Sequence, residues 1–598
     1  MDIEDLSLNP SIRENIEIAK KFINDLLVMG PNAYNSNKSL ESSFIILRRK
    51  YKQNIGKRWL SHAFKELSDS DPINYPKNHP LRFTIMKNAI RSASGIVNVT
   101  VVMPPDRFSC KYNCKFCPNE PGMPRSYLSN EDAVQRAASV DFETVRQVHV
   151  RFRALELNGH PIDKIEFRVL GGTFSCYSHD IADQFIRDLY YAANTYNDTA
   201  TATATARPPM TLEEEQEANT HATIHVVGLG VETRPDEIDE AEIVRFRRYG
   251  VTRVELGVQH TNDDLLRLVG RGHLVSHSKK AIKLLKDYGF KIEIHIMTDL
   301  PGTTPEMDKE CYRKVLQDDP DLIPDYMKDY PCLDVDFTEI KKWKQTGKWK
   351  PYAEIDGGRL LRDVLIYRQE ITPKWVRVNR IQRDFRPACD GRLGFTSETL
   401  TSDLANRVTR EAEERGIYCQ CIRCSEVKNQ TFNENEIEYY VHQIIAGEEF
   451  FICASVPRPN RDLLLGFIRL RLVQNRLKAF ESFSEGHTAM IRELHVYGQV
   501  QVVGSGGSAI AGQSAQHRGI GKQLLQMAED IVKKSGYDRV AVISGIGVRN
   551  YYKKLGYSLK DTYMVKQFSH NRDFEEGIVV VITIIMTVFV FLLLLKIV

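Results

Sequence analysis

The chain has 598 residues, of which 42% are hydrophobic and 27% charged. This composition is typical of a globular protein with a large core, and the length allows about three to four domains. The formal net charge of +3 is close to neutral, which excludes a uniformly basic protein, so any nucleic-acid binding must depend on local patches. The N-terminal run 1–6 is acidic and lacks an apolar core, so we expect no secretory signal there.

Residues 1–90 are predicted to form a polar, helical region. Apolar side chains recur there at helical spacing, at Ile12, Ile16, Ala19, Ile23 and Leu27. The segment 48–58 carries six basic residues, no acid and one tyrosine. This pattern suits a nucleic-acid phosphate backbone, and the alternative is a solvated helix face.

Three cysteines, Cys110, Cys114 and Cys117, stand at the spacing C-x3-C-x2-C. Short-range clusters of cysteines in a chain without a signal peptide indicate metal ligands and a reducing compartment. Fe–S clusters are usually held by four thiolates, so three would leave one iron open to a substrate or cofactor. Phe116 would shield such a cluster from water. The alternatives are a zinc site without its fourth ligand and three unrelated buried thiols.

Residues 91–395 alternate strand and helix patterns. Strands are predicted at 96–103, 164–170, 224–231, 253–258 and 291–297. Repeated strand–helix units predict a parallel sheet curved into a partial or full barrel, with its active site at the carboxyl ends of the strands. Glycines and polar residues follow those ends, at 171–173, 232–235, 259 and 299–302.

Helices are expected between these strands, including one long stretch over 134–158 and another over 276–289. The segment 197–221 contains Thr-Ala repeats followed by acidic residues and lacks apolar periodicity. We therefore predict that it is a disordered surface loop.

A cysteine loop after the first predicted strand and two glycines after the second resemble the radical S-adenosylmethionine enzymes. Within this class the chain is similar, over about 90–568, to the family of the Elongator catalytic subunit, the tRNA uridine carboxymethyltransferases. The strings that carry the resemblance are 90–96, 163–164, 171–174, 232–236, 255–259, 271–273, 299–302 and 381–384. One departure is the run after Cys117, Pro-Asn-Glu-Pro-Gly, where the family usually has two glycines after the proline.

The resemblance implies a 4Fe-4S cluster on Cys110, Cys114 and Cys117. Its open iron would chelate S-adenosylmethionine, and reductive cleavage would yield a 5′-deoxyadenosyl radical. Four residues at strand ends are the candidates for holding S-adenosylmethionine: Gly171, Gly172, Glu232 and Gln259.

A connector is predicted over 396–435, and it contains Cys419, Cys421 and Cys424. Three thiolates this close together suit a structural, tetrahedral zinc ion. Cys389 and His442 are both candidates for the fourth ligand. The alternative is a set of unligated or occasionally oxidised thiols.

Residues 436–568 change character and resemble the GNAT acetyltransferases. Strands are predicted at 463–472, 490–497 and 540–543, and a glycine-rich turn over 516–522 opens a helix over 523–534. Backbone N–H groups at such a helix N-terminus suit a pyrophosphate. The overall fold class is therefore α/β, a radical S-adenosylmethionine partial barrel followed by an α+β GNAT domain.

The GNAT resemblance implies acetyl-CoA as a second cofactor. Its binding residues would be Glu493, Leu494, His495, Val496, Ile520, Gly521, Lys522 and Tyr552. Lys164 matches a lysine that contacts acetyl-CoA from the barrel domain. The catalytic candidates are Lys164, for this contact, and Tyr552. A tyrosine can polarise or protonate the thioester's leaving group.

Both domains together imply one reaction on tRNA. The radical would remove a hydrogen from the acetyl methyl group, and the carbon radical would add to carbon 5 of the wobble uridine, leaving 5-carboxymethyluridine after oxidation and thioester hydrolysis. The uridine must be splayed out to reach the barrel. Two alternatives stay open: a protein lysine N-acetyltransferase with the barrel as scaffold, and a noncatalytic tRNA-binding module. The protein could form a homodimer or bind Elongator-like partner subunits, and the sequence does not decide between them.

The segment 577–595 has 19 residues and no charge. As a helix with a rise of ~1.5 Å per residue it would span roughly the apolar thickness of a bilayer. We predict a transmembrane tail anchor over 577–598, with the catalytic domains in the cytosol; a buried core helix is the alternative.

Overall fold

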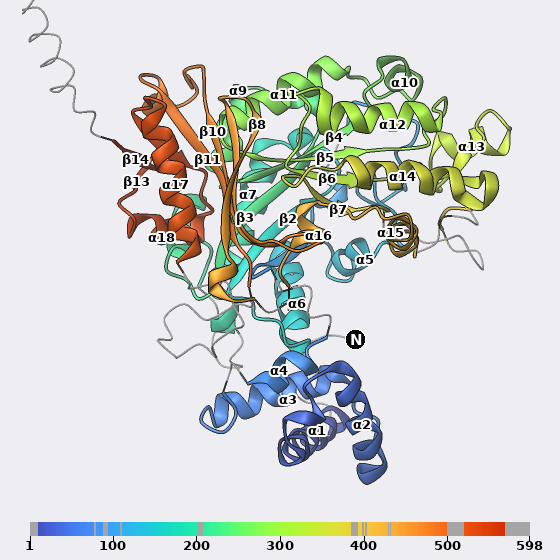
Figure 1. Ribbon diagram of the computed structural model, residues 1–598. Helices are drawn as coiled ribbons and strands as arrows, with labels where there is room; N and C mark the ends of the chain where they lie inside the picture. The colour runs from blue at the N-terminus through green and yellow to red at the C-terminus, as the bar shows by residue number, and fades with distance from the viewer. Residues whose placement is uncertain are drawn as a thin grey trace, which may run out of the picture.

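The computed structural model in Figure 1 describes residues 10–568 with several gaps. The gaps are 77–78, 88–91, 93, 108–109, 200–206, 384, 386–392, 397–399, 401–402, 429, 431 and 499–518. No helix in the described part of the chain is long and apolar enough to cross a membrane. The predicted tail 577–598 lies outside the described residues.

The N-terminal region is helical, as predicted. Its helices are α1 (Pro10–Met29), α2 (Asn37–Tyr51), α3 (Lys57–Ser70) and α4 (Pro80–Ile85). They enclose a core of their own, which includes Phe22, Leu26, Phe44, Leu60 and Phe64. Figure 1 shows this blue bundle at the bottom of the molecule, beside one end of α6.

The first sheet has seven strands in sequence order, and every neighbouring pair is parallel. The strands are β1 (Val97–Val102), β2 (Lys164–Leu170), β3 (His225–Thr233), β4 (Arg253–Gln259), β5 (Lys291–Ile296), β6 (Tyr326–Asp329) and β7 (Arg377–Arg380). Among the described residues β1 and β7 do not pair. The sheet is therefore a partial barrel, as the strand–helix alternation predicts.

Helices connect the strands and pack on the sheet. They are α5 (Asp132–Ala138), α6 (Thr144–Leu157), α7 (His179–Thr199), α8 (Leu212–Asn219), α9 (Glu240–Arg248), α10 (Asp263–Leu268), α11 (Val275–Asp287), α12 (Pro305–Arg313), α13 (Glu339–Gln345) and α14 (Arg359–Ile371). Apolar residues of helices and strands form one continuous core that includes Val99, Phe152, Phe167, Ile282 and Ile294.

The prediction of one helix over 134–158 is wrong. The chain leaves α5 and turns at Asp141 and Phe142, whose φ angles are +53° and +57°. Glu143 then caps α6 by accepting hydrogen bonds from two backbone N–H groups. The break places Gln147 against the edge of β1, where it bonds both the N–H and the C=O of Val102, at 2.9 and 3.0 Å.

The prediction of a disordered loop over 197–221 is also wrong for its described part. α7 continues to Thr199, and α8 begins in a capping box between Thr211 and Glu214. Glu215 is fully buried and pairs with Arg207 at 2.6 Å. Polar contacts rather than an apolar stripe hold this segment, which explains why hydrophobic periodicity gave no signal.

The second sheet has the order β13-β14-β12-β11-β10-β9-β8 and is antiparallel except for the pair β11 and β12. Its strands are β8 (Glu438–Ile445), β9 (Glu449–Val456), β10 (Leu463–Leu472), β11 (Thr488–Val496), β12 (Arg539–Val542), β13 (Ser558–Lys560) and β14 (Tyr563–Gln567). Four further helices are α15 (Leu404–Glu414), α16 (Ile422–Ser425), α17 (Ile520–Lys534) and α18 (Arg549–Lys553). In Figure 1 the second sheet lies between α17 and the first sheet.

A buried ionic network joins the two sheets. Asp325, just before β6, bonds Arg492 of β11 at 2.9 Å and lies 3.3 Å from Arg469 of β10. Lys286 of α11 pairs with Glu449 of β9 at 2.9 Å. The side chains of these residues are at most 2% exposed.

The barrel residues of this network lie at the amino ends of the strands. Asp325 precedes β6, and Lys286 precedes β5. The backbone oxygen of Trp375, which precedes β7, accepts a hydrogen bond from Arg469 at 2.8 Å. The second sheet therefore closes the amino end of the barrel, opposite the carboxyl ends at which the cysteine loop begins.

Replacing Asp325 by Asn should lower the free energy of unfolding by about 3–5 kcal/mol, because Arg469 and Arg492 lose their shared buried counter-charge. Burial opposes ionisation of Asp325, but Arg492 and Arg469 outweigh burial and hold its pKa well below the usual range. Such a carboxylate stabilises the fold above its unfolded pKa of about 3.9, and this contribution is lost as the pH falls through the folded pKa. Urea denaturation should therefore show the largest difference between wild type and variant at neutral pH, and a shrinking one below about pH 4.

Asp264→Asn is the matched control, because this aspartate is 92% exposed in a surface pair with Arg267. It should leave the urea midpoint nearly unchanged. Equal midpoints for Asp325→Asn and wild type at neutral pH would contradict the structural role of the network.

Candidate active site

The cysteine loop follows β1 and is fixed by backbone contacts to distant segments. The N–H of Lys115 bonds the carbonyl of Val269 at 2.9 Å, and the carbonyl of Lys115 accepts from the N–H of Ile340 at 3.2 Å. Phe116 packs against a small apolar cluster that includes Val269, Leu300, Ile340 and Trp343. The loop is therefore held from several sides at the carboxyl end of the sheet.

Cys114 lies between two arginines, Arg234 directly after β3 and Arg271 shortly after α10. Its Sγ is 3.7 Å from Nη1 of Arg234 and 3.5 Å from Nη1 of Arg271. The Arg234 guanidinium lies 3.4 Å from the centre of the Tyr112 ring and pairs with Asp236 at 2.9 Å. Guanidinium groups stabilise a thiolate, so this site suits a thiolate ligand.

Cys110 and Cys117 have different surroundings. A hydrogen bond with the Cys176 thiol lowers the pKa of Cys110 to about 5. Burial raises the pKa of Cys117, and the nearby Cys114 raises it further. Cys176 was not predicted as a site residue, although its position shortly after Gly171-Gly172 at the end of β2 was a signal for it.

The three thiols are not packed as ligands of one ion. In the described part of the chain, only Cys419, Cys421 and Cys424 form such a compact group. Thiolates that bind different irons of a cluster need not converge on a single point. The loop, with Cys114 beside two cations and all three thiols within eight residues, fits a cluster bound by three cysteines.

Gly171 and Gly172 follow β2 with φ angles of +144° and +88°. A Cβ on Gly171 would lie 2.8 Å from Cβ of Met103, so a larger residue does not fit without displacement of that neighbour. Glu232 accepts a hydrogen bond from Tyr127 at 2.8 Å and lies 3.9 Å from His295. Because the strands are parallel, all of these groups share one end of the sheet with the cysteine loop.

Gln259, the last residue of β4, has a φ angle of +73° and is buried. Its carbonyl accepts a hydrogen bond from the N–H of Met297 at 2.7 Å. This contact ties the end of β4 to the segment after β5. Gln259 therefore lies at the same end of the sheet as Glu232.

The interior of the barrel is charged along its length. Alternate residues of β2, β4, β5 and β6 face it, as the two-residue period of a strand requires. Arg168 bonds Glu293 at 2.8 Å and also contacts Glu255, which in turn contacts Lys328. The charges continue to the amino end with Glu166, Arg253 and Lys291, and Arg253 lies 3.0 Å from Glu166.

This interior reaches the second sheet directly. The hydroxyl of Tyr326 on β6 donates a hydrogen bond to Glu493 on β11. Glu493 also pairs with Arg469 at 3.1 Å. Both of these carboxylate contacts belong to the interface between the two sheets. Glu493 is one of the residues that the sequence assigned to acetyl-CoA.

Lys164 is the first residue of β2 and lies at the opposite end of that strand from Gly171. A seven-residue strand spans ~20 Å at ~3.3 Å per residue. Its register partner on β3 is His225. A Cβ on Gly547, just before α18, would lie 2.7 Å from Cβ of His225, so only glycine allows this segment to dock close to Lys164.

The other predicted acetyl-CoA residues gather at the end of β11 and the start of α17. Gly519 caps α17 with a φ angle of +79°, Ile520 is buried and Lys522 is exposed. A Cβ on Gly521 would lie 3.5 Å from Cγ2 of Val496 and 3.3 Å from the hydroxyl of Tyr551. Residues 516–518 of the predicted turn lie outside the described residues.

Leu494 and His495 continue β11 and are partly exposed. The His495 ring stacks on Phe467, with centroids 6.0 Å apart, and its Nε2 lies 3.1 Å from the carbonyl of Ser94, before β1. Tyr552 on α18 is 6% exposed, and burial raises its pKa above the usual range. It is therefore protonated at neutral pH.

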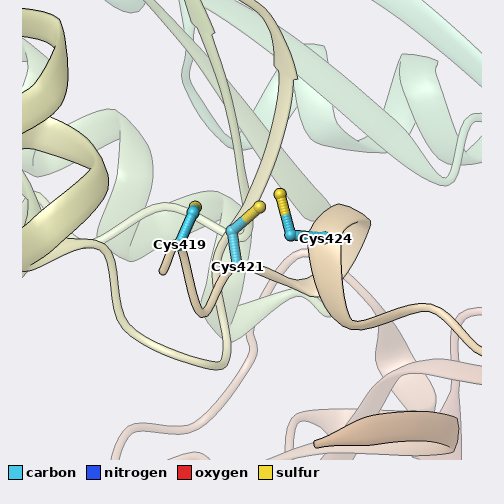
Figure 2. A group of neighbouring side chains, drawn as sticks. All are labelled: Cys419, Cys421 and Cys424. Carbon is cyan, nitrogen blue, oxygen red and sulfur yellow. The ribbon is translucent and has the colours of Figure 1, made fainter. Parts of the chain in front are cut away.

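The second cysteine group is compact, and its sulfur atoms all lie within 4.8 Å of one another. Figure 2 shows Cys419, Cys421 and Cys424 on one turn of chain, with their sulfur atoms on the same side of it. Hydrogen bonds from Cys419 and Cys424 hold the pKa of Cys421 well below the usual range. Three converging thiols fit a tetrahedral metal ion.

His442 does not belong to this group. Its ring lies on β8 against Trp375 and Phe451, with centroids 6.2 and 6.3 Å away. Cys389, the other candidate for the fourth ligand, lies outside the described residues.

The chain matches two protein families in succession. Residues 108–315 match the Radical SAM superfamily, and residues 417–557 match the Acetyltransferase (GNAT) family. These matches confirm the predicted fold class for the partial barrel and the second sheet.

Several relatives match the chain over most of its length. The chain is 37% identical to a tRNA uridine(34) acetyltransferase of Dehalococcoides mccartyi over 489 residues, covering 80% of this chain and 99% of the relative. It is 32% identical to human Elongator complex protein 3, covering 80% and 85%. It also superposes on the archaeal Methanocaldococcus infernus Elp3 with an N-terminus deletion, with a TM-score of 0.65, 33% identity, and coverage of 79% of this chain and 100% of that one. The chain therefore belongs to the family of tRNA uridine(34) acetyltransferases and Elongator complex protein 3, in which a radical SAM domain is joined to a GNAT domain.

Proposed function

We propose that this protein modifies the wobble uridine of tRNA and installs a carboxymethyl group on its carbon 5. The family membership supports a tRNA substrate, S-adenosylmethionine and acetyl-CoA. One observation carries the proposal: the hydrogen bond between Tyr326 of the barrel and Glu493 of the predicted acetyl-CoA strand. It brings the barrel interior into direct contact with the GNAT sheet, which is the arrangement expected if both cofactors act on one acetyl group.

The residues have separate roles in this proposal. Cys110, Cys114 and Cys117 would hold the 4Fe-4S cluster, and Gly171, Gly172, Glu232 and Gln259 would hold S-adenosylmethionine. When bound, these groups would supply a radical that removes hydrogen from the acetyl methyl group. Arg234 and Arg271 would stabilise the thiolate of Cys114, since both guanidinium groups lie within 4 Å of its sulfur.

The acetyl-CoA side of the site would use residues at the amino end of the barrel. Tyr552 is protonated at neutral pH, so its hydroxyl can donate a hydrogen bond or a proton to the thioester's leaving group. Lys164 would meet acetyl-CoA from the barrel side. The charged interior, with Arg168, Glu255 and Lys328, would orient polar groups and bind the uridine between the two ends.

Cys114→Ala should abolish formation of 5-carboxymethyluridine, because a cluster ligand is lost. The measurement is mass spectrometry of nucleosides from tRNA incubated with anaerobically reconstituted enzyme, S-adenosylmethionine, a reductant and acetyl-CoA. Omission of either cofactor should also abolish the product. Cys311→Ala is the control, because Cys311 is also buried but belongs to α12 and not to the cysteine loop.

Full turnover by Cys114→Ala would rule out the radical mechanism. Acetyl transfer to protein lysine by the same variant, with no tRNA product from wild type, would favour the lysine N-acetyltransferase with the barrel as scaffold.

We also propose that Cys419, Cys421 and Cys424 bind zinc. Elemental analysis of purified wild type should find about one zinc ion per chain, and Cys421→Ser should lose it while the iron content stays the same. Cys453→Ser is the matched control, since Cys453 is a buried cysteine of β9 outside the group. Zinc-free wild type with an intact fold would contradict the assignment.

Finally, we propose that residues 577–598 anchor the protein in a membrane, with the catalytic domains in the cytosol. Deletion of 577–598 should move the protein from the membrane fraction to the supernatant in a flotation assay and leave turnover unchanged, because the predicted site lies entirely before residue 568. Membrane association of the truncated chain would disprove the anchor.

A further inference from the structure

A cavity of about 440 Å³ lies where the N-terminal bundle meets the barrel, between α1, α3 and the end of α6. Its volume falls within the range of roughly 300–1,000 Å³ that is typical of pockets for small ligands. None of the residues assigned to the cluster, S-adenosylmethionine, acetyl-CoA or zinc lines it. It is therefore distinct from the candidate active site.

The walls of the cavity are rich in cations. Arg13, Arg58, Lys65 and Arg153 line it, together with two acids, Glu66 and Asp69. Of the acids, Glu66 is already paired, with Lys20 at 2.9 Å and with His62 at 3.1 Å. The cavity thus retains an excess of positive charge, which favours an anionic ligand.

Two of these cations are available to a ligand. Lys65 pairs with Glu156 at 2.6 Å. Arg58 and Arg153, in contrast, form no ion pair with any other residue that the structure describes. Guanidinium groups bind phosphate through paired N–H donors, so these two arginines are suited to a phosphate group.

An aromatic surface stands beside the cations. The Arg58 guanidinium lies over the ring of Trp59, 4.7 Å from its centre, and Trp59 itself lines the cavity. Aromatic rings and guanidinium planes are the surfaces on which proteins stack unpaired bases. A cavity with free arginines and a tryptophan therefore matches the chemistry of a nucleotide, a base together with its phosphate.

The cavity is far from the predicted radical chemistry. α6 begins beside the carboxyl end of β1, where Gln147 bonds Val102, and it ends at Leu157, which lines the cavity. Its 14 residues span ~20 Å at ~1.5 Å per residue. A nucleotide in the cavity cannot reach the cysteine loop, so it is not the reacting uridine.

We propose that this cavity binds one unpaired nucleotide of the tRNA, with its base stacked on Trp59 and its phosphate held by Arg58 and Arg153. This proposal rests on the proposed tRNA function. The bound nucleotide positions the tRNA, and Trp59, Arg58 and Arg153 are positioning residues rather than catalytic ones. Because a base-paired nucleotide cannot stack on a side chain in this way, the cavity selects RNA with an unpaired region.

The test is binding of an unmodified tRNA transcript, and of a fully paired RNA duplex of similar length, by the full chain. Trp59→Leu should weaken tRNA binding by about tenfold, since stacking of one base is worth ~1–3 kcal/mol, and leave duplex binding unchanged. Trp59→Phe should restore most of the tRNA affinity. Arg153→Gln should weaken tRNA binding and reduce the slope of log K against log salt by about one.

Arg49→Gln is the matched control, because Arg49 belongs to the same basic segment but does not line the cavity. It should affect tRNA and duplex alike. Equal tRNA affinity of wild type, Trp59→Leu and Arg153→Gln would overturn the proposal, as would a Trp59→Leu effect of the same size on the duplex.

Steady-state kinetics of tRNA modification distinguish a failure of the nucleotide pocket from a failure of the proposed chemistry. If both hold, Trp59→Leu raises KM for tRNA and leaves kcat unchanged. If wild type binds tRNA through Trp59 but makes no modified uridine, the proposed chemistry fails and the nucleotide pocket stands. If wild type is active and Trp59→Leu has the same KM, the pocket fails and the chemistry stands.

Discussion

The structure depends on one buried ionic interface between the barrel and the second sheet. The acids Asp325 and Glu449 pair with the cations Lys286, Arg469 and Arg492, with almost no exposure to solvent. Buried charges are costly unless every partner is in place, so this network permits only a narrow range of relative positions for the two sheets. The network therefore fixes the position of one sheet relative to the other, as a reaction between two separately bound cofactors requires.

Because of this interface, the two ends of the barrel have different surroundings. The cysteine loop, Gly171-Gly172 and Glu232 lie at the carboxyl ends of the strands, and the second sheet closes the amino ends. Between them the barrel is filled with paired charges such as Arg168 and Glu293 instead of the apolar side chains usual in a buried parallel sheet. Such side chains offer hydrogen-bond partners for a nucleobase or a thioester, which an apolar core would lack.

Much of this architecture could be predicted from the sequence, because apolar runs followed by glycines or polar residues mark five of the seven barrel strands; β6 and β7, with four residues each, were too short to give such a pattern. The split of α5 from α6 could not, since Asp141 and Phe142 adopt left-handed backbone conformations without a glycine. The helix α8 was missed because it is held by the buried pair of Glu215 and Arg207. Its capping box, a threonine three residues before a glutamate, was the available signal.

The surroundings of the candidate site were less predictable than its ligands. Cysteine spacing identifies both thiol groups, but the contacts of Cys114 with Arg234 and Arg271 join residues more than a hundred positions apart. His442 has a suitable side chain for a zinc ligand, yet its strand directs it against Trp375. Such outcomes are set by tertiary packing, which local patterns do not encode.

The central claim is that both cofactor sites act on one acetyl group. The most direct measurement supplies acetyl-CoA with a deuterated methyl group and follows the label by mass spectrometry. The account predicts deuterium in 5′-deoxyadenosine and in the carboxymethyl group of the modified uridine. Formation of modified tRNA with no deuterium in 5′-deoxyadenosine would contradict it.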